Sequence, residues 1–268
     1  MTAPHPTSPV VDRMRDATAR STAARLLRGA GRAGVVAYRE DPDHAHPVLS
    51  HGLTAADLLV LTLPAGSLDP ATSCREVRLR LDRQAADPRV RVSTASLHAL
   101  AHLRLMDEDE VSAMSGLGLL PTEVGWSADA GAQVALLCLD RVLLHDPAGV
   151  TPLSFTDVIE PPCFPTRDQE WLCRDTVEQL GVEGTRTVVD AVVEGRQDGI
   201  VGPQRPTPAS MSGLAGQTVL ADVDGAGCTW LQVDTTGGTR TVFVPFPTTA
   251  RCPEDLERAV DQLAQLAV

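Results

Sequence analysis

The chain has 268 residues, a formal net charge of −12 and a pI near 4.9, and 43% of its residues are hydrophobic. This length and apolar fraction are typical of a globular protein with one large or two modest domains. The acidic balance and an aromatic content of only 3% argue against a nucleic-acid-binding surface. The sequence contains no lysine, which excludes Schiff-base chemistry and a phosphate-binding P-loop.

The first half of the chain predicts one helix followed mainly by strands. An amphipathic helix is expected from about Val10 to Gly29, where glycine stops it. Residues 76–82 alternate apolar and charged side chains, as a half-buried strand does. Further elements are expected as strands at 35–38, 57–64 and 96–106, a helix starting at 107, and a long strand or bent pair of strands at 132–146. Several strands with little helix between them indicate a barrel or a sandwich.

A proline-rich stretch then divides the chain. Residues 158–170 contain three prolines and are expected to form an extended linker. Thr166 and Gln169 match a capping box that opens a helix, which Gly181 ends, and a second helix is expected at 185–195. The Gly/Pro-rich residues 196–217 are mobile, form a partner arm, or contain structure that the pattern does not reveal.

The C-terminal end gives the clearest local signal. Residues 218–246 read as three strands joined by two glycine-containing turns, which predicts a meander. Pro253 and the acidic residues after it are typical of a helix start. The helix that follows has one apolar stripe, formed by Leu256, Val260, Leu263 and Ala267. We expect this helix to pack on the meander.

Cysteine and glycine patterns yield no specific chemistry. The six cysteines include no C-x-x-C pair, so neither a zinc knuckle nor a disulfide scaffold is indicated. Residues 29–34, GAGRAG, match G-x-G-x-x-G, but a predicted helix precedes them and a strand follows, the reverse of a dinucleotide site. No stretch reaches the roughly 18–20 uncharged apolar residues of a membrane helix. The N-terminus has no signal-peptide pattern, so we expect a cytoplasmic protein with reduced thiols and no membrane contact.

Histidines and arginines on the predicted strands are the candidate ligand groups. On a helix, His98 and His102 would align as two metal ligands, but the alternation of residues 97–105 favours a strand. On a strand they would lie about 13 Å apart, too far to hold one ion, so no metal site is predicted. Neighbouring strands carry Arg78, Arg80 and Arg104, which could bind a phosphate or propionate, or simply form a solvated face of an acidic protein. All seven histidines precede the linker, so the C-terminal half offers no imidazole ligand or base.

Three stretches together resemble the haem-utilisation family. They are VDRMRDATARSTAARLL (11–27), the strands leading to DRVLLHD (140–146), and the ending from DGAGCTWLQVD through TRTVFVPFPTTARCPEDLERAVDQL (224–263). The resemblance implies an α+β fold: a mostly antiparallel, flavin-binding-type split β-barrel of the pyridoxamine-phosphate-oxidase class with a smaller C-terminal α/β domain. It implies a split-barrel domain at 1–157, a linker at 158–168 and a C-terminal domain at 169–268. It also implies a homodimer with its ligand near the subunit interface.

The sequence departs from the family pattern at the residues that carry chemistry. Haem-degrading members have a His-Met-Asn-x-Asp-His-like stretch in the first C-terminal helix, whereas WLCRDTVEQLG (171–181) has no histidine. We therefore expect a divergent, non-catalytic member that acts as a ligand- or partner-binding, regulatory protein, without assigned catalytic residues. The alternative is a haem-degrading or FMN-dependent oxidoreductase. The ligand-binding candidates are Arg78, Arg80, Arg104, His98 and His102, with His51 as an alternative haem ligand and haem or FMN as the cofactor.

Overall fold

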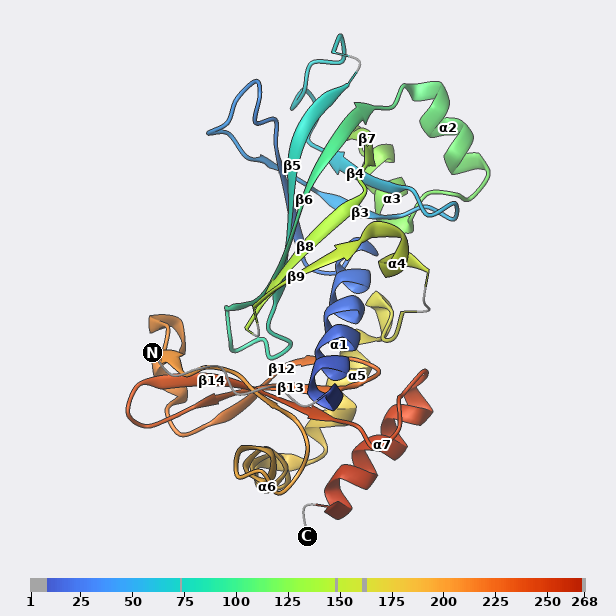
Figure 1. The fold of residues 1–268 in the computed structure, drawn as a ribbon. Coiled ribbons are helices and arrows are strands. Elements are labelled where there is room, and N and C mark those ends of the chain that lie inside the picture. Colours follow the sequence, from blue (N-terminus) through green and yellow to red (C-terminus); the bar gives the residue numbers. More distant parts are fainter. Residues whose placement is uncertain (1–8, 73, 148, 161–162, 267–268) are drawn as a thin grey trace.

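A computed structural model describes residues 9–72, 74–147, 149–160 and 163–266. It contains two antiparallel sheets, one of nine strands and one of five, with helices packed on both (Figure 1). The predicted α+β class is confirmed, and the arrangement fits a split barrel followed by a C-terminal α/β region. The nine-stranded sheet is not a closed barrel, since the ends of its strand path, β2 and β3, do not pair with each other within the described residues.

The N-terminal part builds the larger sheet. Its strands are β1 (Arg32–Val36), β2 (His46–Pro47), β3 (Ser50–Leu53), β4 (Leu59–Leu63), β5 (Arg75–Gln84), β6 (Ser93–Leu105), β7 (Gln133–Cys138), β8 (Arg141–Asp146) and β9 (Gly149–Ser154). Its helices are α1 (Pro9–Leu27), α2 (Glu108–Gly116), α3 (Thr122–Asp129) and α4 (Phe155–Ile159). The sequence predicted α1 and α2, and the bent pair at 132–146 is β7 followed by β8.

The nine-stranded sheet branches at the long strand β6. Its C-terminal residues, from His102 to Leu105, pair with β7, whereas Ser96–His98 near its start pair with β8. The sheet therefore divides on one side of β6 into a β7–β4–β3 branch and a β8–β9 branch. The buried side chains of β5 and β6 alternate along each strand and pack with the apolar side of α1, which includes Leu26 and Leu27.

The C-terminal part contains the smaller sheet. Its strands are β10 (Ile200–Val201), β11 (Arg205–Pro206), β12 (Thr218–Val223), β13 (Gly227–Val233) and β14 (Gly238–Pro245). Its helices are η1 (Arg167–Gln169), α5 (Glu170–Glu178), α6 (Gly181–Val193), η2 (Ala209–Leu214) and α7 (Pro253–Leu266). The predicted meander is confirmed as β12–β13–β14, and α5, α6 and α7 share its core. Leu256, Val260 and Leu263 of α7 are buried as predicted, while Ala267 lies outside the described residues.

The structure refines the sequence-based predictions in three regions. The 158–170 stretch is not extended throughout, because Ser154 caps a short α4 that reaches Ile159 and η1 begins at Arg167. Residues 196–217 agree with one of the predicted alternatives, that they contain structure which the pattern does not reveal: β10 and β11 pair with β14 and enlarge the sheet to five strands. These strands have two residues each, which is too short to show a periodic pattern, and they are defined by their pairing with β14. The 35–38 strand is displaced to 32–36, where β1 pairs with β5.

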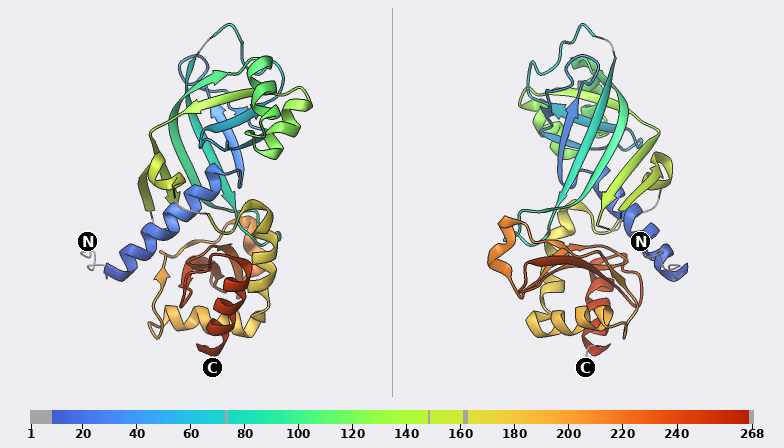
Figure 2. Two further views of the ribbon diagram at one scale, coloured as in Figure 1. Left: turned by 90° about the vertical axis from the view of Figure 1, so that its right-hand side faces the viewer. Right: turned by 60° about the vertical axis from the view of Figure 1, so that its left-hand side comes forward.

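The turn between β5 and β6 joins the two parts. Figure 2 shows this hairpin reaching from the larger sheet to the smaller one, with α1 crossing between them. The backbone N–H of Ala86 donates to Ala221 O at 2.8 Å, and that of Asp87 donates to Leu220 O at 3.1 Å. Val90 is 3% exposed and packs with Met211, in a cluster on the smaller sheet. The hairpin tip, residues 85–92, thus contributes to the C-terminal core.

Candidate functional site

The outward side chains of β5, β6 and β8 form the candidate site, called here the β5–β6–β8 face. They are Arg78, Arg80, His98, Leu100, His102, Leu143 and His145. Each lies between buried neighbours on its strand, except that His145 has buried Leu144 on one side and half-buried Asp146 on the other. Successive side chains of a strand point to opposite faces. The strand interpretation of His98 and His102 is therefore confirmed.

This face differs from the neighbouring branch of the same sheet in having no helix over it in the described part of the chain. On the β7–β4 branch, Val124 of α3 is fully buried against Val60 and Val134. On the β5–β6–β8 face, Leu100 is 66% exposed and Leu143 is 43% exposed. Apolar side chains that remain on an open sheet face suit a ligand or another protein surface.

Strand register sets which groups meet. Arg80 is opposite His98, and His98 is opposite Leu143 on the other side. The rings of His98 and His145 lie 4.7 Å apart, centroid to centroid, in an edge-to-face arrangement. The structure therefore gives His98 a histidine neighbour from another strand, whereas His102 is opposite Glu76 and Cys138.

The arginine charge on this face is only partly neutralised by carboxylates of the same chain. Arg80 Nε lies 2.9 Å from Asp82 Oδ2. Partial burial, with His145 and Arg80 nearby, lowers the pKa of His98 and so favours its neutral imidazole. Arg104 lies further along β6 and binds Glu110 of α2 at 2.7 Å, so it belongs to the α2 end of the strand. Among the described residues, no group of three or more His, Cys, Asp or Glu side chains is arranged to hold a metal ion.

His51 lies away from this face. It is on β3, is 5% exposed, and its Nε2 is 2.7 Å from the backbone oxygen of Leu26 at the end of α1. Burial lowers its pKa to about 4. A neutral imidazole in this position donates to a helix C-terminal carbonyl, which is a structural role.

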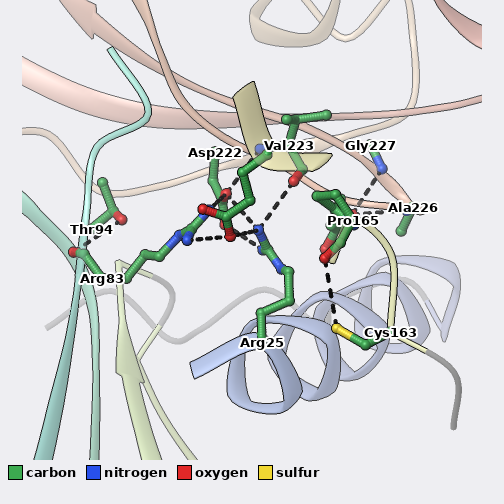
Figure 3. Close-up of polar contacts among 11 residues, drawn as sticks. Arg25, Arg83, Thr94, Cys163, Pro165, Asp222, Val223, Ala226 and Gly227 are labelled. Carbon is green, nitrogen blue, oxygen red and sulfur yellow. Dashed lines mark hydrogen bonds and ion pairs between the residues drawn. The ribbon is translucent and has the colours of Figure 1, made fainter. Parts of the chain in front are cut away.

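A buried ionic cluster at the junction of the two sheets was not foreseen from the sequence. Figure 3 shows Arg25 of α1 and Arg83 of β5 converging on Asp222 of β12. Arg25 Nη2 is 2.5 Å from Asp222 Oδ2, and Arg83 Nη2 is 2.9 Å from Asp222 Oδ1. Arg83 Nη1 also lies 2.6 Å from Glu170 Oε1 at the start of α5. These residues come from four distant segments, so only the fold brings them together.

A pocket of about 540 Å³ adjoins this cluster and is called here the junction pocket. Its lining includes Arg25, Arg28, Thr54, Thr122, Cys163 and Arg167. The end of α1, the β3–β4 turn, the start of α3 and the segment before α5 all contribute to it. Several charged side chains thus surround a space large enough for a small molecule.

Comparisons with known proteins show a fold relationship. No known protein family matches the sequence, and neither does any curated protein. The structure is similar to that of a haem-binding protein from Mycobacterium smegmatis, with a TM-score of 0.52 and 15% identity over 93% of this chain and 97% of that chain. A protein of unknown function from Agrobacterium tumefaciens aligns with a TM-score of 0.34 and 12% identity over 97% and 98% of the two chains. The first likeness shows a shared architecture, and the second is too weak to add to it.

Two of the candidate groups could be found only in the structure. His145 and Leu143 alternate with buried residues in DRVLLHD, which marks them as outward-facing. That pattern does not say that β8 pairs with β6, so their position beside His98 could not be deduced.

No helix in the described part of the chain is both long and apolar enough to cross a membrane.

Proposed function

We propose that this protein is a non-catalytic tetrapyrrole-binding protein of the haem-utilisation split-barrel type, with its site on the β5–β6–β8 face. The observation that carries the proposal is the His98–His145 ring pair, flanked by Arg80 and by exposed leucines on an open sheet face. Imidazole is a common ligand of haem iron, and arginine binds carboxylates in bidentate geometry. The apolar side chains would contact the ring.

The residues present fit haem. His98 or His145 would hold the iron, since both rings stand on the outward side of the sheet and the lowered pKa of His98 favours the neutral imidazole that binds iron. Arg78 and Arg80 lie two residues apart on one strand, roughly 7 Å along it, and could each bind a propionate. Bound haem would supply an iron centre, and these side chains would position and charge-balance it. The haem-binding neighbour from Mycobacterium smegmatis is the reason to prefer haem over FMN.

We further propose that a second copy of the chain covers this face. Leu100, Leu143 and Val150 are 66%, 43% and 56% exposed, respectively, on adjacent strands β6, β8 and β9. A two-fold interface uses the same patch on both copies, so one apolar face can bury itself against its counterpart. The ligand would then lie close to the subunit interface, where both copies exclude water from it.

Hemin titration followed by absorption spectroscopy tests the ligand. The wild type is expected to give a protein-bound Soret band, which the His98→Ala/His145→Ala double variant loses. His44→Ala is the matched control, because His44 is exposed on the loop before β2, apart from the face. Arg78→Gln/Arg80→Gln should weaken hemin binding at least tenfold. A spectrum identical in the wild type and the double variant would contradict the site.

The enzyme alternatives give different results in the same samples. A protein that is yellow as purified, with a flavin spectrum, favours an FMN-dependent oxidoreductase. Loss of the Soret band on adding a reductant in air, with release of an open-chain product, favours haem degradation. A stable Soret band under these conditions supports binding without catalysis.

Light scattering tests the dimer. Leu100→Arg should convert a dimer into a monomer, because a charge replaces an apolar contact at the centre of the interface. Leu117→Arg is the control, since Leu117, the residue that follows α2, is 73% exposed and outside the face. A monomeric wild type, or dissociation by both variants alike, would contradict this interface.

A further inference from the structure

We propose that the junction pocket is a second ligand site, which binds the carboxylate of a small metabolite through Arg28. The site is separate from the β5–β6–β8 face and does not depend on tetrapyrrole binding. It is formed where α1 ends, beside the segment that leads into α5.

Among the arginines of this pocket, Arg28 lacks a counter-charge within the described residues. Its Nη2 donates to the backbone oxygen of Ile159 at 2.5 Å. Its Nη1 is buried without a hydrogen-bond partner, and within the described residues Arg28 forms no ion pair. The two other lining arginines are neutralised, Arg25 by Asp222 at 2.5 Å and Arg167 by Glu123 at 3.0 Å. A buried donor without an acceptor is unfavourable, and a ligand oxyanion would supply both an acceptor and a negative charge.

A second unsatisfied donor lies on the same wall. The Nε of Arg25 is buried and has no partner, although the two Nη atoms of this residue bind Asp222. Arg25 and Arg28 are one helical turn apart at the end of α1, so their side chains leave the helix in similar directions. The hydroxyl groups of Thr54 and Thr122 add further polar lining.

The carboxylates of the lining indicate what the rest of the ligand is like. Four carboxylates line the pocket, and two of them are paired: Glu123 with Arg167 and Glu170 with Arg83. The other two, Asp57 and Asp168, are exposed, which places them toward its mouth. A single uncompensated arginine inside and two carboxylates outside disfavour a dianion such as phosphate. They favour a ligand whose carboxylate enters first and whose other end is neutral or cationic. The volume of about 540 Å³ suits a small metabolite.

Calorimetric titration with three matched probes tests this inference: butyrate, 4-aminobutyrate and succinate. The three share a four-carbon chain and one carboxylate, but end in a methyl, an ammonium and a second carboxylate, respectively. We expect butyrate and 4-aminobutyrate to bind, with succinate at least tenfold weaker. Failure of all three to bind overturns the site, and tighter binding of succinate overturns the assigned ligand class.

Variants locate the binding to Arg28. Arg28→Gln should weaken 4-aminobutyrate binding at least tenfold. Arg28→Lys keeps the positive charge and should weaken this binding less. Arg32→Gln is the control, since Arg32 is an exposed arginine on β1. Circular dichroism and hemin titration of Arg28→Gln show whether the fold and the other site are intact. Unchanged 4-aminobutyrate binding in a folded Arg28→Gln protein would overturn the proposal.

Discussion

Asp222 binds two arginines across the contact between the two parts of the chain. It accepts from Arg25 and Arg83, which are 197 and 139 positions away in the sequence. Burial opposes ionisation of Asp222, but the two guanidinium groups outweigh burial and hold its pKa well below its usual value of 3.8. A buried carboxylate shared by two arginines is fully charged in the folded protein.

Replacing Asp222 should therefore destabilise the protein and change its acid response. Asp222→Asn leaves the two buried arginines with only Glu170 as a counter-charge and is expected to cost about 3–5 kcal/mol. Because the folded pKa is depressed, the contribution of Asp222 is present above pH 3.8 and is lost as the pH falls below it. Urea unfolding between pH 7 and pH 3 checks both points.

The control for Asp222 is an exposed ion pair. Asp175 is 59% exposed and binds Arg174 at 2.7 Å on the surface of α5. Asp175→Asn should change the free energy of unfolding by less than about 1 kcal/mol. Equal losses in the two variants would show that the buried cluster contributes no more than a surface pair.

His51 predicts a second, separate pH dependence. Its folded pKa is about 4, lowered by burial from 6.5, so the unfolded chain binds a proton more readily over that interval. The free energy of unfolding should decrease as the pH falls from 6.5 to 4, by up to about 3 kcal/mol. His51→Gln, which keeps an N–H donor for Leu26, should reduce this slope, whereas His44→Gln should not. An unchanged slope in His51→Gln would rule out His51 as its source.

At the scale of single elements, β6 shows where sequence reasoning ends. The alternation of apolar residues from Ala95 to Leu103 identifies a strand and assigns His98 and His102 to one face. The ring partner of His98 depends on the pairing of β6 with β8, whose start is about forty residues further along the chain. Short strands such as β3 and β10 were missed for the same reason, since their partners rather than their own periodicity define them.

The last helix was predictable because its signals are local. Pro253 begins it, acidic residues follow, and its apolar stripe is buried against the meander. Leu263 is 1% exposed, so Leu263→Ala should lower the free energy of unfolding by about 2–5 kcal/mol. The adjacent exposed Gln262→Ala should change it by less than about 0.5 kcal/mol. Chemical denaturation measures both, and equal values would contradict the packing of α7.

For the whole molecule, the two sheets are expected to unfold together. We propose the division into 1–157, 158–168 and 169–268 as a description of the chain, but contacts across it are extensive. The hairpin tip packs with Met211, and Arg25 and Arg83 bind Asp222. Calorimetry should therefore show one cooperative transition in the wild type.

Ala86→Pro tests this coupling. It removes the N–H that donates to Ala221 O, and it should broaden the transition or divide it into two. Two well-separated transitions in the wild type would show that the two parts are thermodynamically independent.

The hairpin tip also has a consequence for fragments of this protein. Because residues 85–92 complete the core around Met211, Val219 and Leu231, a C-terminal piece produced alone would expose these side chains to water and aggregate. A chain cut between the two parts after folding is different, since the tip is already in place. Its two pieces should stay bound to each other and elute as one species. Cleavage of the linker would therefore not show that the protein has lost its fold.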